Sequence, residues 1–339
     1  MMIKIIDNFQ KWALSKGPDL DFESIESFTP LREQASLRRY FRILTNNGTK
    51  IGVVSELGSS ENELFKHFSE FFIQNGIRAP KVEALDIEKG FMIVEDFGDK
   101  VLQLFISPDN KEIFFKAAIE EIYKIQSCNT SITLKTLSEE DLKNQMSLFE
   151  TWFLEELLNF NLSDDDRIIV HDSWKKIALN CSKQPYVLCH FDFEFRNLML
   201  LSDNNIGVLD FQDLCFGPYG LDLASILMDI DHPIDRREFR EYLDFYKHLT
   251  QKEGKEENYS LAEMEKDVDY SGFQRQFRIL GTLSRLHIRD KKSFRLPDLS
   301  QTLKYLIKGS YKYSELEELG AFLDEKMLPR LNEFLGMIK

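Results

Sequence analysis

The sequence predicts an α+β protein with two lobes, a small one built on an antiparallel sheet with one helix and a larger one that is mostly helical. At 339 residues the chain exceeds the length at which a single hydrophobic core usually stops growing. Short β-rich runs fill much of the first 95 residues, and helical periodicity dominates the rest. We therefore expect an N-terminal lobe over residues 1–95 and a C-terminal lobe over residues 96–339.

The N-terminal lobe is predicted from turn and cap signals between its apolar runs. Asn46-Asn47-Gly48 separates two alternating β-rich runs, which is typical of a hairpin. A helix follows, with Ser60 and Glu63 at capping-box spacing and Asn75-Gly76 at its end. Two more short strands come after Pro80 and complete a small sheet.

The C-terminal lobe is predicted from apolar residues at helical spacing. We expect helices over residues 111–126, 142–160 and 166–180, and further helices from Leu221 onward. Between them, brief strands flank a loop rich in charged residues.

The composition argues against some classes of binding partner. The net charge of −14 argues against nucleic acid or an anionic membrane, which need clustered Lys and Arg. The N-terminus has no signal-peptide pattern, and we find no apolar run of membrane-spanning length. The four cysteines form no C-x-x-C pair and are expected to be buried free thiols in a reducing cytoplasm. A cytoplasmic protein with a small-molecule partner is expected.

The most informative stretch runs from His190 to Asn197, followed thirteen residues later by Asp210. Phosphoryl transfer needs a carboxylate to orient the acceptor hydroxyl and take its proton, and oxygen ligands to hold magnesium on the phosphates. Asp192 fits the first role, and Asn197 with Asp210 fits the second, at the H-x-D-x-x-x-x-N and D-F-x spacing of kinases. The alternative is that Asp192 and Asp210 are ordinary loop carboxylates that cap turns.

Neighbouring residues are expected to support this site. His190 is interpreted as holding the loop rather than transferring protons. Asp222 is either the N-cap of a helix or a partner of the loop's backbone. Asp213 is either a second carboxylate facing the metal or a turn residue.

The phosphate cradle departs from the usual kinase pattern. The turn at residues 33–36 lacks the glycines of G-x-G-x-x-G, and no lysine stands where V-A-I-K would place one. Arg38 or Arg42 is predicted to bind phosphate in its place, with Glu63 as a candidate partner; the alternative is a solvated edge strand. The segment containing Glu95 and Phe97 is expected to offer backbone groups to the adenine of ATP.

Several motifs together resemble the aminoglycoside phosphotransferase and choline kinase superfamily, whose fold is like that of protein kinases. Within it, the chain is most similar to bacterial cell-wall sugar kinases that phosphorylate the anomeric hydroxyl of N-acetylmuramate and N-acetylglucosamine. The likeness covers nearly the whole chain and rests on segments 35–42, 75–98, 190–199, 207–213, 217–227 and 277–299. The resemblance implies an enzyme that uses ATP and Mg²⁺, with Asp192 as catalytic base and Asn197 and Asp210 as metal ligands.

The acceptor is less closely defined by the sequence. The cell-wall group usually has a second His two residues after the catalytic Asp, where this chain has Glu194. A carboxylate there suits a hydroxyl-rich or amino sugar better than an anionic one such as N-acetylmuramate. Glu194, Arg196 and Asp213 are candidate acceptor contacts. The sequence gives no way to tell whether Arg275, Arg278 and Arg285 reach an acceptor or only solvate a helix.

Three functions are compatible with these residues. The leading one is a sugar or amino-sugar kinase that uses ATP and magnesium. The second is a kinase for a cationic acceptor, an aminoglycoside or a choline-like amine. The third, motivated by the missing lysine and glycines, is a catalytically silent nucleotide-binding module. The sequence does not predict the oligomeric state or a preference between ATP and GTP.

Overall fold

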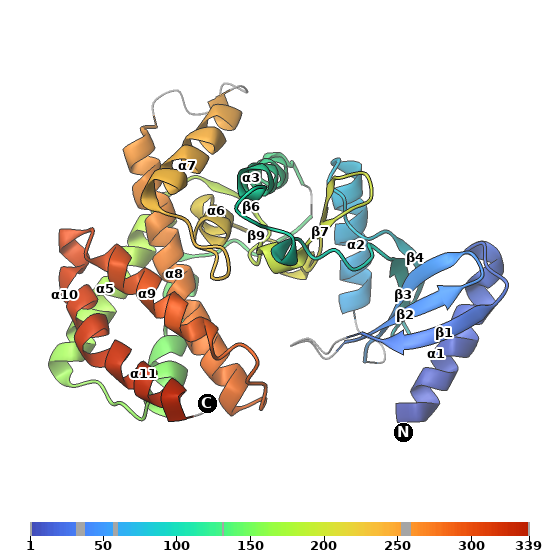
Figure 1. Ribbon diagram of the computed structural model, residues 1–339, viewed down its shortest axis with the longest axis horizontal. Helices are drawn as coiled ribbons and strands as arrows, with labels where there is room; N and C mark the ends of the chain where they lie inside the picture. Colours follow the sequence, from blue (N-terminus) through green and yellow to red (C-terminus); the bar gives the residue numbers. More distant parts are fainter. Residues whose placement is uncertain (1, 32–37, 57–59, 131, 252–258, 338–339) are drawn as a thin grey trace. The chain divides into compact units, whose positions relative to one another are not determined.

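The structure, a computed structural model, describes residues 2–31, 38–56, 60–130, 132–251 and 259–337 (Figure 1). The turn at residues 33–36, where we looked for phosphate-binding glycines, lies outside these residues. The chain divides into two units. The first comprises residues 1–105 and 195–213, and the second comprises residues 106–194 and 214–339.

The first unit is built on a five-stranded antiparallel sheet with the order β1-β2-β3-β5-β4 (Figure 1). Its strands are β1 (Ile25–Pro30), β2 (Arg39–Thr45), β3 (Gly48–Val54), β4 (Val82–Asp86) and β5 (Phe91–Glu95). The predicted hairpin joins β2 to β3, with Thr45 opposite Gly48. Gly48 has a φ of 107°, which a residue with a Cβ rarely adopts.

Two helices accompany this sheet. Helix α1 (Met2–Lys16) packs Phe9, Trp12 and Ala13 against apolar residues of β2, β3 and β5. Its close approach explains Gly52 of β3, where a Cβ would lie 2.6 Å from the Phe9 ring. Helix α2 (Glu61–Gln74) is the helix predicted after the hairpin. The expected capping box is wrong, because the Ser60 side chain makes no capping hydrogen bond.

Residues 195–213 return to the first unit, which a single boundary at residue 95 did not anticipate. They form a hairpin of β7 (Leu198–Leu200) and β8 (Ile206–Val208). Isolated bridges join Gly207 to Arg78 and Met199 to Val101. These bridges pair residues that lie far apart in the sequence, which local sequence patterns do not encode.

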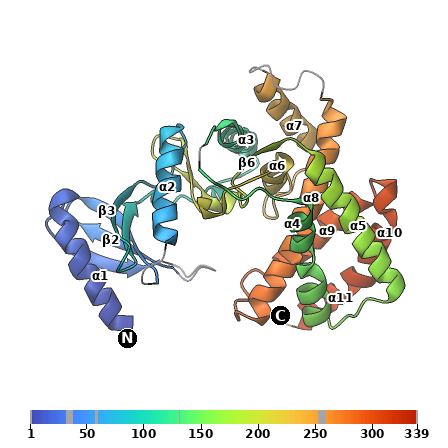
Figure 2. The ribbon, with the colours of Figure 1, turned by 180° about the vertical axis from the view of Figure 1, so that it is seen from behind.

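The second unit is mostly helical (Figure 2). It contains one short two-stranded sheet, in which β6 (Tyr186–Cys189) pairs with β9 (Cys215–Pro218). Helices α4, α5 and α8 pack against one another. The helices are α3 (Lys111–Ser127), α4 (Glu139–Met146), α5 (Asp164–Lys183), α6 (Gly220–Leu227), α7 (Arg236–Gln251), α8 (Leu261–Ile288), α9 (Asp298–Ser310), α10 (Glu317–Ala321) and α11 (Leu328–Met337), with π-helical segments at Phe149–Leu157 and Phe322–Met327.

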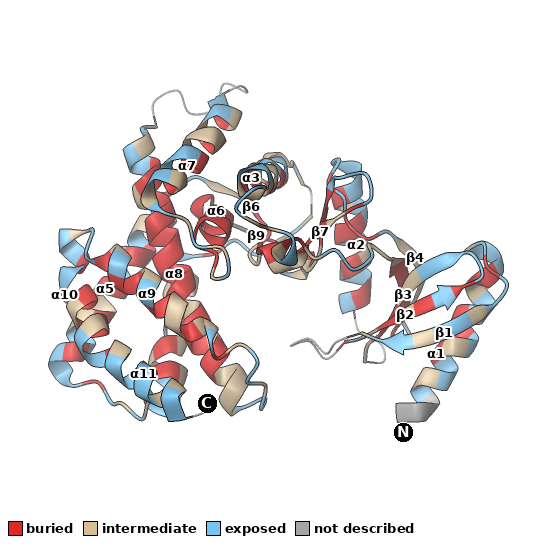
Figure 3. Cartoon of the chain, viewed as in Figure 1, coloured by how far each residue is buried: buried red, intermediate tan, exposed pale blue. Residues whose placement is uncertain are grey.

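The core of the second unit centres on α6 and the middle turns of α8 (Figure 3). Every residue of α6 is buried. Phe149, Phe153, Trp174 and Phe277 form a group of aromatic contacts beside α8. Phe149 and Phe153 belong to a stripe of apolar residues at helical spacing, and both are fully buried in the core.

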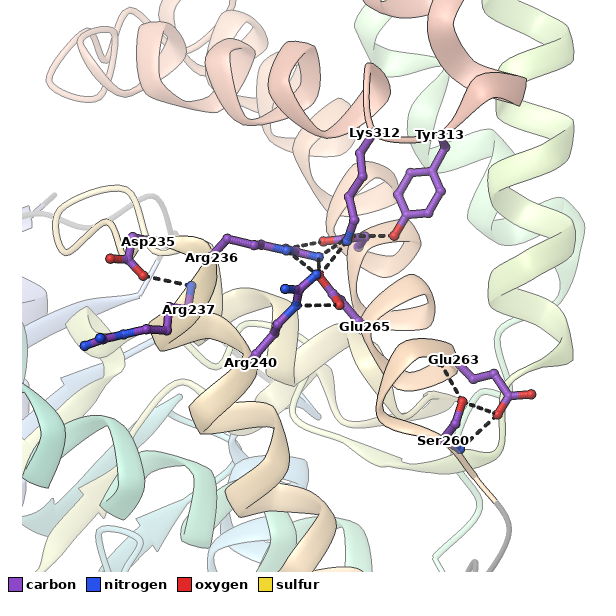
Figure 4. A network of polar contacts seen from close by, with 10 residues as sticks. Asp235, Arg236, Arg237, Arg240, Ser260, Glu263, Glu265, Lys312 and Tyr313 are labelled. Carbon is purple, nitrogen blue, oxygen red and sulfur yellow. Dashed lines mark hydrogen bonds and ion pairs between the residues drawn. The ribbon is translucent and has the colours of Figure 1, made fainter.

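A network of ion pairs ties α7 and the residues after α9 to the N-terminal half of α8 (Figure 4). Arg236 of α7 forms a bidentate pair with Asp269, at 2.9 and 2.5 Å, and also pairs with Glu265. Lys312 donates to Glu265 at 2.6 Å and to Asp269 at 2.9 Å. Both carboxylates are almost fully buried, so each needs such partners. We call this set the helix-clamping network.

The predicted fold class is confirmed, with an antiparallel sheet near the N-terminus and a mostly helical remainder. Three of the four cysteines are buried and all four are free thiols, as expected. Burial raises the pKa of Cys181 to about 12, which leaves that thiol unreactive. Among the described residues, no helix is both long and apolar enough to cross a bilayer.

Candidate active site

Residues 190–194, which we call the Asp192 loop, follow directly after β6 in the second unit. The loop is held in an uncommon backbone conformation, since Phe191 has a φ of 79°. Non-glycine residues in this region are strained and persist only where their surroundings fix them. The strain lies immediately before the carboxylate that the sequence singled out.

Asp222, in the first turn of α6, holds the backbone of the Asp192 loop in this conformation. Its carboxylate accepts hydrogen bonds from the backbone N–H of His190 at 2.7 Å and of Phe191 at 2.9 Å. The sequence suggested that Asp222 is either the N-cap of a helix or a partner of the loop's backbone. The structure shows the backbone contact, and the N-cap of α6 is Tyr219. Burial raises the pKa of Asp222, while the charge of His190 and the two N–H donors oppose that shift. His190 is fully buried, with its ring edge-on to Phe193.

Two arginines of α8 bind the other side of the Asp192 loop. Arg278 donates to the Asp192 carboxylate at 3.0 Å and to the Phe191 carbonyl at 3.3 Å. Arg275, only 3% exposed, forms a buried ion pair with Glu194. The two arginines are three residues apart and therefore lie on one face of the helix. Sequence reasoning named both residues but gave no way to place them.

The pairing of Glu194 changes the charge expected around this residue. Its side chain is 10% exposed, with Arg275 on one oxygen and Arg295 4.0 Å from the other. The sequence suggested a carboxylate that would repel an anionic acceptor. In the structure two guanidinium groups compensate this charge, so the argument against an anionic sugar no longer holds.

The two predicted metal ligands lie in the first unit at the open end of the β7–β8 hairpin, with Asn197 just before β7 and Asp210 just after β8. The N–H of Leu209 donates to the Asn197 carbonyl at 2.9 Å, which joins the two ends. Asp210 has a φ of 62°, a second strained non-glycine residue at a predicted site position. Gln212 donates a side-chain hydrogen bond to the Asp210 carboxylate, a contact that the sequence analysis did not foresee.

Phe211 anchors this segment to the first unit. It is fully buried, and its ring centroid lies 4.8 Å from that of Phe65 and 5.4 Å from that of Phe72, both in α2. The neighbouring Asp210 is thereby fixed relative to α2. An amide oxygen and a carboxylate suit magnesium, which takes few protein ligands and leaves the others to water and phosphate. Asn197 and Asp210 therefore fit this metal.

The two candidate phosphate-binding arginines have different partners. Arg42 binds the segment after β5: its guanidinium contacts the carboxylates of Asp96 and Asp99 and the carbonyl of Gly98, at 2.5 to 3.1 Å. Because side chains alternate along a strand, it shares a face of β2 with Tyr40. With these contacts already made, a phosphate would have to compete for Arg42.

Arg38 contacts residues of α2 and β2. It pairs with Glu61 of α2 at 3.7 Å, lies over the Phe65 ring and is hydrogen-bonded to the Tyr40 side chain. The charges of Asp210 and Glu61 both reach that tyrosine, and burial raises the pKa of its hydroxyl. The acid that meets Arg38 is thus Glu61; the suggestion of Glu63 is wrong.

The remaining predicted residues occupy varied positions. Glu95 ends β5, where its carboxylate accepts from Arg78 at 3.1 Å and its N–H donates to the Lys81 carbonyl. Phe97 packs against Gly207, where a Cβ would lie 2.6 Å from its ring. Arg196 is half-buried in a short 3-10 turn, and Asp213 is exposed at the end of another.

Comparison with known proteins places this geometry among phosphotransferases. A model described as the phosphotransferase enzyme family matches residues 27–260. The chain is 27% identical over 320 residues to an N-acetylmuramate/N-acetylglucosamine kinase of Neisseria meningitidis, covering 93% of this chain and 94% of that one. A kinase of the same name from Pseudomonas aeruginosa is 28% identical over 300 residues, covering 87% of each chain.

Solved structures share the fold at low sequence identity. The choline kinase LicA from Streptococcus pneumoniae superposes with a TM-score of 0.62 at 14% identity, covering 89% of this chain and 99% of that one. The aminoglycoside phosphotransferase APH(2'')-Ib, bound to ADP, gives 0.60 at 16% identity, covering 90% and 98%. The protein-kinase-like fold implied by the sequence resemblance is thereby confirmed.

Proposed function

Because the chain belongs to the phosphotransferase enzyme family, we propose that it transfers the γ-phosphate of ATP, with magnesium, to a hydroxyl of a sugar or amino sugar. The acceptor class we propose is N-acetylglucosamine or N-acetylmuramate, with the anomeric hydroxyl as the reacting group. The observation that carries this choice is similarity over about nine tenths of both chains to kinases named for these sugars.

In the proposed reaction, the acceptor oxygen attacks the γ-phosphorus while the bond to the β–γ bridging oxygen breaks, and ADP leaves. Asp192 orients the acceptor hydroxyl and takes its proton. Asn197 and Asp210 would hold magnesium, which when bound neutralises charge on the phosphates. Arg38 takes the place of the missing lysine on the phosphates. Its pairing with Glu61 and its hydrogen bond to Tyr40 support that role.

Other predicted residues act through the loops that carry these groups. Asp222 and His190 hold the Asp192 loop in shape, and Glu95 and Phe97 belong to the segment proposed to bind adenine. The anionic lactyl group of N-acetylmuramate is admissible, because Arg275 and Arg295 compensate the charge of Glu194. Arg196 and Asp213 remain proposed acceptor contacts.

A coupled assay of ATP consumption tests this function. The purified chain would be given magnesium and, separately, N-acetylglucosamine, N-acetylmuramate, other hexoses, choline and kanamycin. Phosphorus NMR of the product would locate the new phosphate, and a mock purification from cells that lack this chain would serve as the control for contaminating kinases. We expect turnover of an N-acetylated amino sugar with phosphate on the anomeric oxygen.

Turnover of choline or kanamycin alone would overturn the acceptor but not the kinase chemistry. Binding of magnesium and ATP without consumption across the whole panel would instead indicate a silent nucleotide-binding module.

A further inference from the structure

Arg278 contacts two successive residues of the Asp192 loop with one guanidinium group. Its Nη2 donates to Asp192 Oδ1 at 3.0 Å and to the Phe191 carbonyl at 3.3 Å. The guanidinium carbon also lies 4.1 Å from the centroid of the Phe191 ring. Arg278 therefore contacts both the ring and the backbone carbonyl of the strained Phe191, and it also contacts the carboxylate of Asp192.

Such contacts restrict a side chain that is otherwise loosely determined. The terminal torsion of an aspartate is broad, so its carboxylate rotates readily unless a partner holds it. With Oδ1 bound to Arg278, rotation of the Asp192 carboxylate is limited. Asp192 is also partly exposed, at 35% of its side chain, so a ligand can reach it.

The position of Arg278 is imposed by the fold. It lies within the 28-residue helix α8, whose turn at Arg275 is fixed to the same loop by the buried pair with Glu194. Within the described part of the chain, Nε of Arg278 is buried without a hydrogen-bond partner. A buried unsatisfied donor costs stability, so this placement is not what optimal burial of an arginine would give.

We infer that Arg278 is a positioning residue for the proposed base, and that it sets the rate of transfer by holding the Asp192 carboxylate toward the acceptor. The inference rests on the proposed function for the role of Asp192. It also separates three arginines that the sequence left equivalent: Arg275 holds the loop, Arg278 aligns the base, and Arg285, two turns further along α8, makes no contact with the loop among those recorded for the described residues.

Steady-state kinetics of Arg278→Gln, with Arg285→Gln as the matched control, test the inference. We expect Arg278→Gln to lower kcat by about 10- to 100-fold, the effect of a small misplacement at a reacting centre, with KM for ATP nearly unchanged. Arg278→Lys should recover only part of this loss, because an ammonium group cannot reproduce the flat fork that stacks on Phe191. Arg285→Gln should behave like the wild type.

A double-mutant cycle distinguishes positioning from a general structural role. If Arg278 acts through Asp192, adding Arg278→Gln to Asp192→Asn should change the residual kcat by less than about 3-fold. A structural role would lower the residual activity by the same factor as in the wild type, and that result would overturn the inference.

The wild type, Arg278→Gln, Asp192→Asn and the double variant would also be compared by thermal unfolding, a measurement that does not require activity. Non-additive melting temperatures would establish the Asp192–Arg278 pair, whereas additive ones would contradict it. If the wild type were inactive on every acceptor, the proposed function would fail while this unfolding cycle still decided whether Arg278 holds Asp192.

Discussion

Helix α8 carries two sets of arginine–carboxylate pairs that have the same chemistry and different consequences. Near its N-terminal end, Glu265 and Asp269 receive Arg236 and Lys312 in the helix-clamping network. Further along, the helix contributes the arginines, and the carboxylates belong to the Asp192 loop. The first set joins helices to one another, whereas the second joins a helix to a strained loop.

The two sets of pairs differ in the kind of segment that α8 is joined to. Pairs between regular helices stabilise packing, and their loss is felt by the whole unit. The Arg278–Asp192 pair ends on a strained, partly exposed loop and determines the direction of one side chain. The comparison therefore predicts that changes in the first set lower stability and spare kcat, and that loss of the Arg278–Asp192 pair lowers kcat with little effect on stability.

The largest effect is expected for Asp192→Ala. Loss of a general base typically lowers turnover by about 10²- to 10⁴-fold, and kcat should fall within that range while KM for ATP changes little. Steady-state kinetics with the best acceptor would measure it. Asp172→Ala is a suitable control, because that carboxylate is half exposed and pairs with Lys175 on the surface of α5. Near-normal turnover of Asp192→Ala would end the assignment of the base.

A moderate effect on stability is expected for Asp269→Asn. The change weakens charged hydrogen bonds from Arg236, Lys312 and Tyr313 and should reduce the free energy of unfolding by about 2 kcal/mol. Urea unfolding would give this value, and kcat of the folded variant should stay within about 2-fold of wild type if the two sets are independent. A large fall in kcat without loss of stability would break the comparison.

The smallest effect is a pH dependence of the helix-clamping network. Burial alone would raise the pKa of Glu265, but hydrogen bonds from Lys312 and Arg240 and the charge of Arg236 lower it to about 2. A carboxyl with a lowered pKa stabilises the fold above its unfolded pKa, and the stabilisation is lost as the pH falls from about 4.5 to about 2. Glu265→Gln should therefore lose less stability than the wild type over that interval. Melting temperatures measured from about pH 5 downward test this, and parallel curves would contradict it.

The sequence predicted the parts of the molecule whose signals are local. The hairpin at Asn46-Asn47-Gly48, the helical stripes and the order of sheet and helices follow from turn chemistry and apolar spacing. The motif residues Asp192, Asn197 and Asp210 were found for the same reason, because their spacing is contained in one short stretch. Their catalytic roles stay predictions until they are tested.

The parts that escaped prediction depend on contacts between distant positions. Arg275, Arg278 and Arg285 look alike in sequence, and only the fold places the first two against the Asp192 loop. Glu61 rather than Glu63 meets Arg38, because the start of α2 is not the capping box that the sequence suggested. The return of residues 195–213 to the first unit follows from backbone pairing with Arg78 and Val101, which no local pattern announces.

That return also determines how the chain can be divided. A fragment that ended after residue 105 would lack Phe211 and leave the aromatic rings of Phe65 and Phe72 without their cover. The first compact unit is therefore made of two segments that are not consecutive in the sequence. A chimera that exchanged the first unit between relatives would have to exchange residues 195–213 with it, so the proposed metal ligands Asn197 and Asp210 would move with the five-stranded sheet, whereas Asp192 would stay with Arg275 and Arg278.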